Sequence, residues 1–160
     1  MAQWRRMQST DIPQVMALAD QLHPGLPERA EVFAERQKLY PEGCLVLERD
    51  GEILGYGVSH PVPPESPPQL DTFLGSIPPE ATDYYIHDVA LSPKLRGSGL
   101  ARVGIEMLLE QASRYRQAVL ISVYGTGPFW ARFGFIPSSA NLDGKLSAYG
   151  DDAVYMVRAA

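Results

Sequence analysis

One stretch constrains the fold more than any other part of the chain: a short apolar run followed by a glycine-rich turn and a helical pattern. Residues 84–91 are rich in aromatic and β-branched side chains, which is typical of a mostly buried strand. Ser92-Pro93 ends the run because proline cannot donate to a strand ladder. From Leu100 the apolar residues recur with helical spacing, so the stretch predicts a strand, a turn and an amphipathic helix.

The turn itself, Arg96-Gly97-Ser98-Gly99-Leu100-Ala101, carries small residues where a strand gives way to a helix. Free backbone N–H groups can converge there, and the positive end of a helix dipole favours an anion, most naturally a phosphate. The alternative is a turn that binds no ligand, because many such turns need glycine only to adopt positive φ. The turn is not a P-loop, because no Lys-Ser or Lys-Thr pair follows the glycines. It is not a Rossmann dinucleotide-binding turn either, because no third glycine stands at the required spacing.

The spacing Arg96-x-x-Gly99-x-Ala101, after a buried strand and a proline, resembles the signature of the GCN5-related N-acetyltransferase (GNAT) superfamily. The resemblance is sharp over 86–108 and covers nearly the whole chain by order of elements. It implies an α/β fold, with a mixed, mostly antiparallel sheet flanked by helices. It also implies that the sheet is splayed between its fourth and fifth strands, where coenzyme A enters.

Size, charge and cysteine content limit the classes of partner. At 160 residues, with no repeats and no dividing linker, we expect one domain over 1–160. A net charge of -5 and a pI near 5.1 argue against nucleic acid as a partner. Cys44 is the only cysteine, which excludes an internal disulfide and a thiolate metal cluster, and we expect it to be a packed apolar residue. No apolar run has the length of a membrane span and the N-terminus lacks signal-peptide architecture, so we expect a soluble, cytoplasmic protein without membrane or metal partners.

Apolar patterns, caps and turns predict the remaining elements. Strands are expected at 3–7, 43–48, 53–59, 118–123 and 153–158, and helices over 12–22, after a cap at 9–11, and over 28–39. Seven prolines between 61 and 82 predict a long surface loop with polyproline character. We expect this loop, anchored by Phe73 and Leu74, to be a lid, a dimer contact or a tolerated insertion. The helix that begins at Leu100 is expected to place Leu100, Val103, Met107 and Leu108 on its apolar face.

For the cofactor, the resemblance implies acetyl-CoA, held mainly by main-chain groups. The residues expected to bind it are Val89, Ala90 and Leu91, for the pantetheine arm, and Arg96, Gly97, Ser98, Gly99, Leu100 and Ala101, for the pyrophosphate. A backbone N–H on the acetyl carbonyl would supply oxyanion-type stabilisation.

Acetyl transfer to an amine requires removal of the ammonium proton, and histidine is the natural base near neutral pH. Strict alternation along the strand puts Tyr85, His87, Val89 and Leu91 on one face and Asp88 on the other, where it would hold a helix end or a loop. His87 matches in position one of the two histidines that aralkylamine N-acetyltransferases use in proton removal. The alternative is a hydrogen-bonded core histidine.

The resemblance also implies a tyrosine that protonates the departing thiolate, four residues before a Gly-Phe pair. Gly134-Phe135 matches that pair, but Trp130 stands at the tyrosine position, and indole cannot act as a general acid. Tyr124 is one candidate substitute, and release of the thiolate with water as the donor is the other. Trp130 is expected either to pack on the pantetheine arm or to be a core aromatic.

In the superfamily, the loop between the first two helices commonly forms one wall of the acceptor pocket, and the resemblance makes His23, Phe33 and Tyr40 candidates for substrate contact. The leading hypothesis is an acetyl-CoA-dependent N-acetyltransferase that acts on a small-molecule or amino-acid-like amine by direct attack. One alternative is a non-catalytic acyl-CoA-binding or regulatory module, which the Trp130 replacement favours. Another is transfer of a longer acyl group, for which Gly55 and Gly57 would leave room. The superfamily often forms dimers, so a homodimer is a further expectation.

Overall fold

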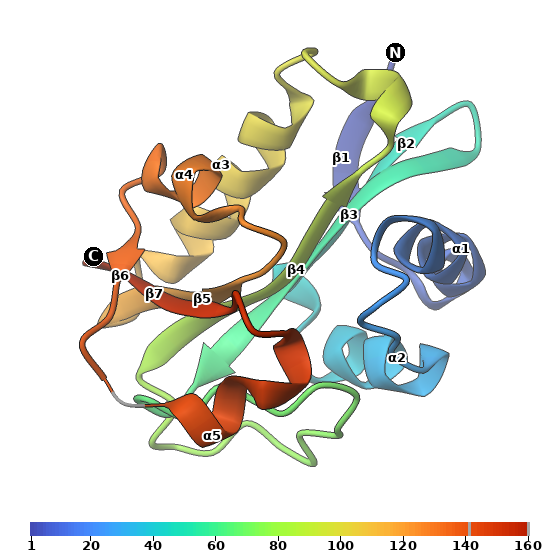
Figure 1. Ribbon diagram of the computed structural model, residues 1–160. Helices are drawn as coiled ribbons and strands as arrows, with labels where there is room; N and C mark the ends of the chain where they lie inside the picture. The colour runs from blue at the N-terminus through green and yellow to red at the C-terminus, as the bar shows by residue number, and fades with distance from the viewer. Residues whose placement is uncertain (141, 160) are drawn as a thin grey trace.

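The computed structural model describes residues 1–140 and 142–159, in which seven strands form one mixed sheet (Figure 1). The strand order is β1-β2-β3-β4-β5-β7-β6. The strands are β1 (Gln3–Arg6), β2 (Cys44–Arg49), β3 (Glu52–Val62), β4 (Asp83–Leu91), β5 (Gln117–Ser122), β6 (Ile136–Pro137) and β7 (Val154–Ala159). Neighbouring strands are antiparallel except β4 and β5, which are parallel. The predicted α/β fold with a mixed, mostly antiparallel sheet is confirmed.

Helices cover both faces of this sheet (Figure 1). The helices are α1 (Ile12–Leu22), α2 (Ala30–Leu39), α3 (Leu100–Ala112), α4 (Gly127–Ala131) and α5 (Asp143–Leu146). A buried cluster that includes Phe33 and Tyr56 joins α1 and α2 to one face. A second cluster, with Ile105 and Leu108 of α3, covers the other face over β4 and β5. These two cores hold β4 between the two helical layers. The C-terminal end of β4 is therefore supported from both faces of the sheet.

The buried face of α3 differs from the predicted one. Ile105 and Leu108 are buried, whereas Val103 and Met107 are 47% and 38% exposed. The buried side of the helix also contains Gly104. A search for regularly spaced apolar side chains overlooks this residue because glycine has no side chain. The prediction was therefore right for Leu108 and wrong for Val103 and Met107, because Gly104 lets α3 approach Trp4 of β1 closely.

Gly104 leaves the space that the Trp4 indole of β1 occupies. A Cβ at Gly104 would overlap three indole atoms, and Trp4 Nε1 donates a hydrogen bond to the Leu100 carbonyl at 2.9 Å. We expect Gly104→Val to lower the free energy of unfolding by about 1–3 kcal/mol, since the added side chain overlaps the indole and would displace it from its hydrogen bond to Leu100. Chemical denaturation measures this change. Gly127→Val is the control, because no atom lies within 4 Å of its Cβ position, and an equal loss in both variants would contradict the packing argument.

The proline-rich segment begins later than predicted. Pro61 and Val62 are buried and pair with Tyr84 and Asp83, so β3 continues for two residues into the expected loop. The surface loop accordingly spans 63–82. Phe73, predicted as an apolar anchor, is instead 52% exposed, with the Arg29 guanidinium 5.0 Å from its ring centroid.

Candidate active site

A cleft opens where β4 and β5 stop pairing. Their parallel register ends at Ile86 of β4, although β4 continues to Leu91 and β5 to Ser122. Two adjoining cavities occupy the gap, of about 130 Å³ and about 40 Å³, and both are lined by His23, His87, Asp88, Ile121 and Val123. The larger one, here named the α4 lobe, is also lined by Val89, Tyr124, Thr126, Phe129 and Trp130. The smaller one, here named the α2 lobe, is also lined by Leu26, Glu28, Leu70 and Tyr149.

The backbone of β4 faces this cleft at alternate residues. The Ser92 amide donates to the Leu54 carbonyl of β3 at 2.7 Å, and the same register pairs Ala90 with Tyr56. Because bonded pairs alternate along an antiparallel ladder, the amide and carbonyl of Ala90 face β3, whereas those of Val89 and Leu91 face the side that β5 has left. Two of the three predicted pantetheine contacts therefore present free main-chain groups to the gap.

The glycine-rich turn after β4 has the backbone that the sequence predicts. Gly97 and Gly99 adopt φ of +79° and +80°, and no atom lies within 4 Å of a Cβ built on either. The Leu100 amide is capped by Ser98 Oγ at 3.3 Å, while the first-turn amides of α3 have no acceptor within the helix. The turn thus exposes main-chain donors at the positive end of a thirteen-residue helix, an arrangement suited to a phosphate group.

A β-bulge interrupts β4 inside the cleft. Val58 pairs with Asp88, but the next β3 residue, Ser59, pairs with Ile86, so His87 is left without a partner on β3. The extra residue changes the alternation, and His87 and Asp88 both line the two lobes. The expectation that they occupy opposite faces was wrong. Val89 packs instead against the cluster beneath α3.

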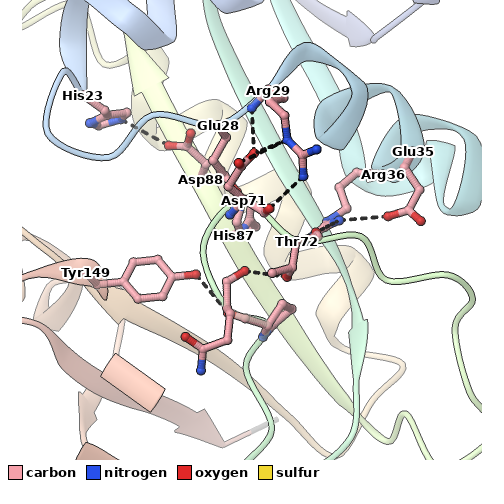
Figure 2. Close-up of polar contacts among 12 residues, drawn as sticks. His23, Glu28, Arg29, Glu35, Arg36, Asp71, Thr72, His87, Asp88 and Tyr149 are labelled. Atoms are coloured by element: carbon pink, nitrogen blue, oxygen red, sulfur yellow. Dashed lines mark hydrogen bonds and ion pairs between the residues drawn. The ribbon is translucent and has the colours of Figure 1, made fainter. Parts of the chain in front are cut away.

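His87 makes a buried pair with a residue that sequence reasoning missed. Its Nε2 lies 2.7 Å from Glu28 Oε1, and the two side chains are only 2% and 5% exposed (Figure 2). Glu28 Oε2 also accepts the Asp71 amide at 2.9 Å. Burial opposes ionisation of Glu28, but His87, the Asp71 amide and the charge of Arg36 outweigh it and hold its pKa below the usual range. The Glu28 carboxylate orients the His87 imidazole through this contact.

His23 enters the same cleft from the loop between α1 and α2. Its Nε2 lies 3.2 Å from Asp88 Oδ1 (Figure 2). Asp88 Oδ2 accepts the Tyr56 hydroxyl at 2.7 Å. Burial disfavours the charged imidazole, but Asp88 and Glu28 outweigh it, so the pKa of His23 is raised above its ordinary value. Asp88 thus holds a loop, as expected, although it does so from within the cleft.

Tyr124 and Trp130 stand at the outer wall of the α4 lobe. Tyr124 has φ of +54° and is 52% exposed, and its ring stacks on His23 with 10° between the planes. Such a backbone conformation is uncommon for a non-glycine residue and tends to occur at functional sites. Trp130 is partly buried against Phe133 and Phe135, and it also lines the lobe. Trp130 therefore belongs partly to the core, and its expected packing on the pantetheine arm stays a prediction.

The proline-rich loop forms one wall of the α2 lobe, through Leu70. Polar groups of α2 and the residues before it hold the loop in place (Figure 2). Arg29 donates to the Asp71 carboxylate, and the Arg36 guanidinium donates to the Thr72 carbonyl. Glu35 accepts the backbone amides of Leu74 and Gly75. From the other side of the loop, the Tyr149 hydroxyl donates to the Pro68 carbonyl. Because Glu28 contacts both Asp71 and His87, the docked loop is linked directly to the histidine at the base of the cleft.

Other candidate residues lie outside the cleft. Phe33 is 2% exposed and packs edge-on against Tyr56 in the core beneath α1. The Tyr40 hydroxyl lies 3.3 Å from that of Tyr115, near the end of α3. The structure therefore brings His23, but neither Phe33 nor Tyr40, to the expected acceptor wall. Cys44 is fully buried, and burial raises the pKa of its thiol to about 12, so the thiolate form is suppressed.

Over 1–140 and 142–159, no group of three or more His, Cys, Asp and Glu side chains is placed to hold a metal ion. In the same part of the chain, no helix combines the length and apolar character needed to cross a membrane.

Solved structures resemble the chain over almost its full length. The GphF GNAT-like decarboxylase in complex with isobutyryl-CoA matches with a TM-score of 0.81 and 16% identity, over 98% of both chains. Rv2747 from Mycobacterium tuberculosis, in complex with CoA and NLQ, matches with a TM-score of 0.72 and 17% identity, over 99% of each chain. Ard1 from Thermoplasma volcanium matches with a TM-score of 0.75 and 15% identity, over 99% of this chain and 97% of that one. At such identities the likeness establishes the fold alone.

Sequence comparison adds family membership. No curated protein sequence matches significantly. The family model described as acetyltransferase (GNAT) family matches residues 7–135, which include β4, the glycine-rich turn, α3 and α4. Because this match covers well over half of the chain and agrees with the fold, the chain belongs to the GNAT acetyltransferase family.

Proposed function

We propose that this protein is an acetyl-CoA-dependent N-acetyltransferase that acetylates the amine of a small-molecule acceptor by direct attack, with His87 as the general base. The observation that carries the proposal is the buried His87–Glu28 pair at the junction of the two lobes, with Nε2 and Oε1 2.7 Å apart. A histidine whose carboxylate partner stabilises its protonated form is suited to accept a proton from an attacking amine.

The cofactor fits the main-chain groups on the α4 side. When bound, acetyl-CoA supplies a thioester whose carbonyl carbon is open to attack by an amine. The turn from Arg96 to Ala101 would hold the pyrophosphate through its exposed amides, and the outward-facing groups of Val89 and Leu91 would hold the pantetheine arm. A β4 amide directed at the carbonyl oxygen would stabilise the negative charge of the tetrahedral intermediate. Trp130 would form the outer wall against the arm.

The acceptor would enter from the α2 lobe. This lobe is small, about 40 Å³, and combines the apolar side chains of Leu26 and Leu70 with the carboxylates of Glu28 and Asp88. Carboxylates attract an ammonium group, and the small volume favours a compact amine over a bulky one. His87 lies between this lobe and the α4 lobe, so it can remove the amine proton where acceptor and thioester would meet.

Two alternatives receive less support. A non-catalytic acyl-CoA-binding module would have no use for a buried histidine–carboxylate pair at the lobe junction. Transfer of a longer acyl group was linked to the glycines of β3, but a Cβ at Gly57 would contact Leu108 and one at Gly55 would contact Leu91 and the Ala90 carbonyl. These glycines make room for protein atoms, not for an acyl chain.

The test is steady-state release of CoA from acetyl-CoA, with a panel of compact primary amines as acceptors and detection of the acetylated product by mass spectrometry. We expect amine-dependent turnover that exceeds hydrolysis of acetyl-CoA without an acceptor. Parallel assays with isobutyryl-CoA examine the longer-acyl alternative. Tight acetyl-CoA binding without turnover of any amine would instead favour the non-catalytic module.

A further inference from the structure

The α4 lobe contains a second histidine that the base mechanism does not use. His23 lines both lobes, and its side chain is 22% exposed. Both ring nitrogens are buried; Nε2 lies 3.2 Å from Asp88 Oδ1, whereas Nδ1 makes no hydrogen bond to any residue in the described ranges. Buried polar atoms without partners are uncommon in native proteins and call for an explanation such as a ligand or a catalytic role.

The groups around His23 favour its protonated form. Asp88 of β4 faces Nε2 at 3.2 Å, Glu28 adds negative charge from the segment before α2, and the Tyr124 ring stacks on the imidazole from beyond β5. Asp88 is itself held by the Tyr56 hydroxyl at 2.7 Å. Contact with Asp88 occupies the Nε2 proton of the imidazolium, so the Nδ1 proton remains available for transfer.

The alternative donor, Tyr124, is less well placed. A Cβ at Gly25 would lie 3.3 Å from the Tyr124 hydroxyl, so this hydroxyl is turned toward the α1–α2 loop, and the residue is 52% exposed. Trp130, at the position where the family resemblance places a donor, has no transferable proton near neutral pH. His23 is therefore the side chain of the α4 lobe whose chemistry and surroundings suit proton donation.

We propose that His23 is the general acid of this site and delivers its Nδ1 proton to the departing thiolate of CoA. This inference rests on the proposed function. In the reaction, the C–N bond forms between the neutral amine and the acetyl carbon, the C–S bond breaks, and its electron pair leaves with sulfur. His87 takes the proton that the amine loses, and His23 gives one to sulfur. Exchange of one proton with solvent at each histidine restores both.

The test compares His23→Gln with Tyr124→Phe, which keeps the stacked ring and removes only the hydroxyl. Amine acetylation is measured from pH 6 to 9.5, and calorimetric titration with acetyl-CoA checks that each variant retains a folded cofactor site. A general acid must be protonated, so its benefit is present below its pKa and disappears as pH rises through that value. We expect His23→Gln to lose at least about tenfold in kcat at pH 6.5, with a deficit that shrinks toward unity by about pH 9.5. The kcat of Tyr124→Phe should stay within about threefold of the wild-type value.

Each other result would overturn the inference. A large loss in Tyr124→Phe with little change in His23→Gln would make the phenol the donor. Near-wild-type activity in both variants would mean that the thiolate leaves unassisted. A His23→Gln deficit that does not depend on pH would indicate a structural role. If the wild type binds acetyl-CoA but acetylates no amine, the proposed function itself is refuted. The wild-type assay alone shows this, so it is distinguished from a failure of the His23 assignment, which only the variants test.

Discussion

His87→Ala is expected to lose about 100- to 10,000-fold in kcat/KM for amine acetylation while it binds acetyl-CoA as tightly as the wild type. The loss follows from removal of the group that accepts the amine proton. Cofactor binding should be retained because the proposed contacts come from the β4 backbone and the turn after it. Steady-state kinetics and calorimetry on the same preparations separate the two effects. Retained turnover in His87→Ala would contradict the assignment of the base.

The partner of His87 can be tested with a matched pair of glutamates that both hold the proline-rich loop. Glu28 and Glu35 each accept backbone amides of the proline-rich loop, but only Glu28 contacts His87. Glu28→Gln should therefore reduce kcat by at least about tenfold, because a neutral amide cannot stabilise the imidazolium. Glu35→Gln should affect kcat little. Equal losses in the two variants would show that docking of the loop, and not the charge beside His87, is what matters.

Gly99→Asp is expected to weaken acetyl-CoA binding by at least about 100-fold, equivalent to about 2.7 kcal/mol. The new carboxylate would project from a position with open space around it, at the helix end where the pyrophosphate would bind. A negative charge at that point repels the ligand and opposes the helix dipole. Aspartate tolerates positive φ better than most residues, so the turn should keep its backbone.

The matched control is Gly75→Asp in the proline-rich loop. Gly75 has φ of +76°, close to the +80° of Gly99, and likewise no atom within 4 Å of a Cβ position. The two positions share backbone conformation and open space, but Gly75 lies in the proline-rich loop, where its amide donates to Glu35 Oε2 at 2.9 Å. Calorimetric titration should give an unchanged dissociation constant for Gly75→Asp, and unchanged binding in Gly99→Asp would exclude the turn as the phosphate site.

The strand–turn–helix unit could be predicted because its determinants are local. The β-branched run of β4, the following Pro93 and the two glycines each act within a few residues, and the backbone takes positive φ at both Gly97 and Gly99. The orientation of α3 could not be predicted in the same way. It depends on Trp4, about a hundred residues away, which fills the space above Gly104.

The site was harder to predict for two physical reasons. The bulge at His87 depends on how β4 pairs with β3, and a register shift of one residue cannot be read from a strand pattern. Glu28 stands 59 residues before His87, and its only local signal is an acidic residue at the start of a helix, which usually reflects capping. Candidates chosen for their place near the first two helices therefore included His23, which lies in the cleft, and Phe33, which belongs to the core.

The gap between β4 and β5 has a consequence for the abundance of the folded protein. A ligand that satisfies the outward-facing main chain of Val89 and Leu91 acts as a missing strand and binds only the native chain. By mass action, cofactor at 100 times its dissociation constant would add about 2.7 kcal/mol to the free energy of unfolding. The melting temperature should then rise with the logarithm of acetyl-CoA concentration, and a cell rich in this metabolite would hold more of the protein in its native state.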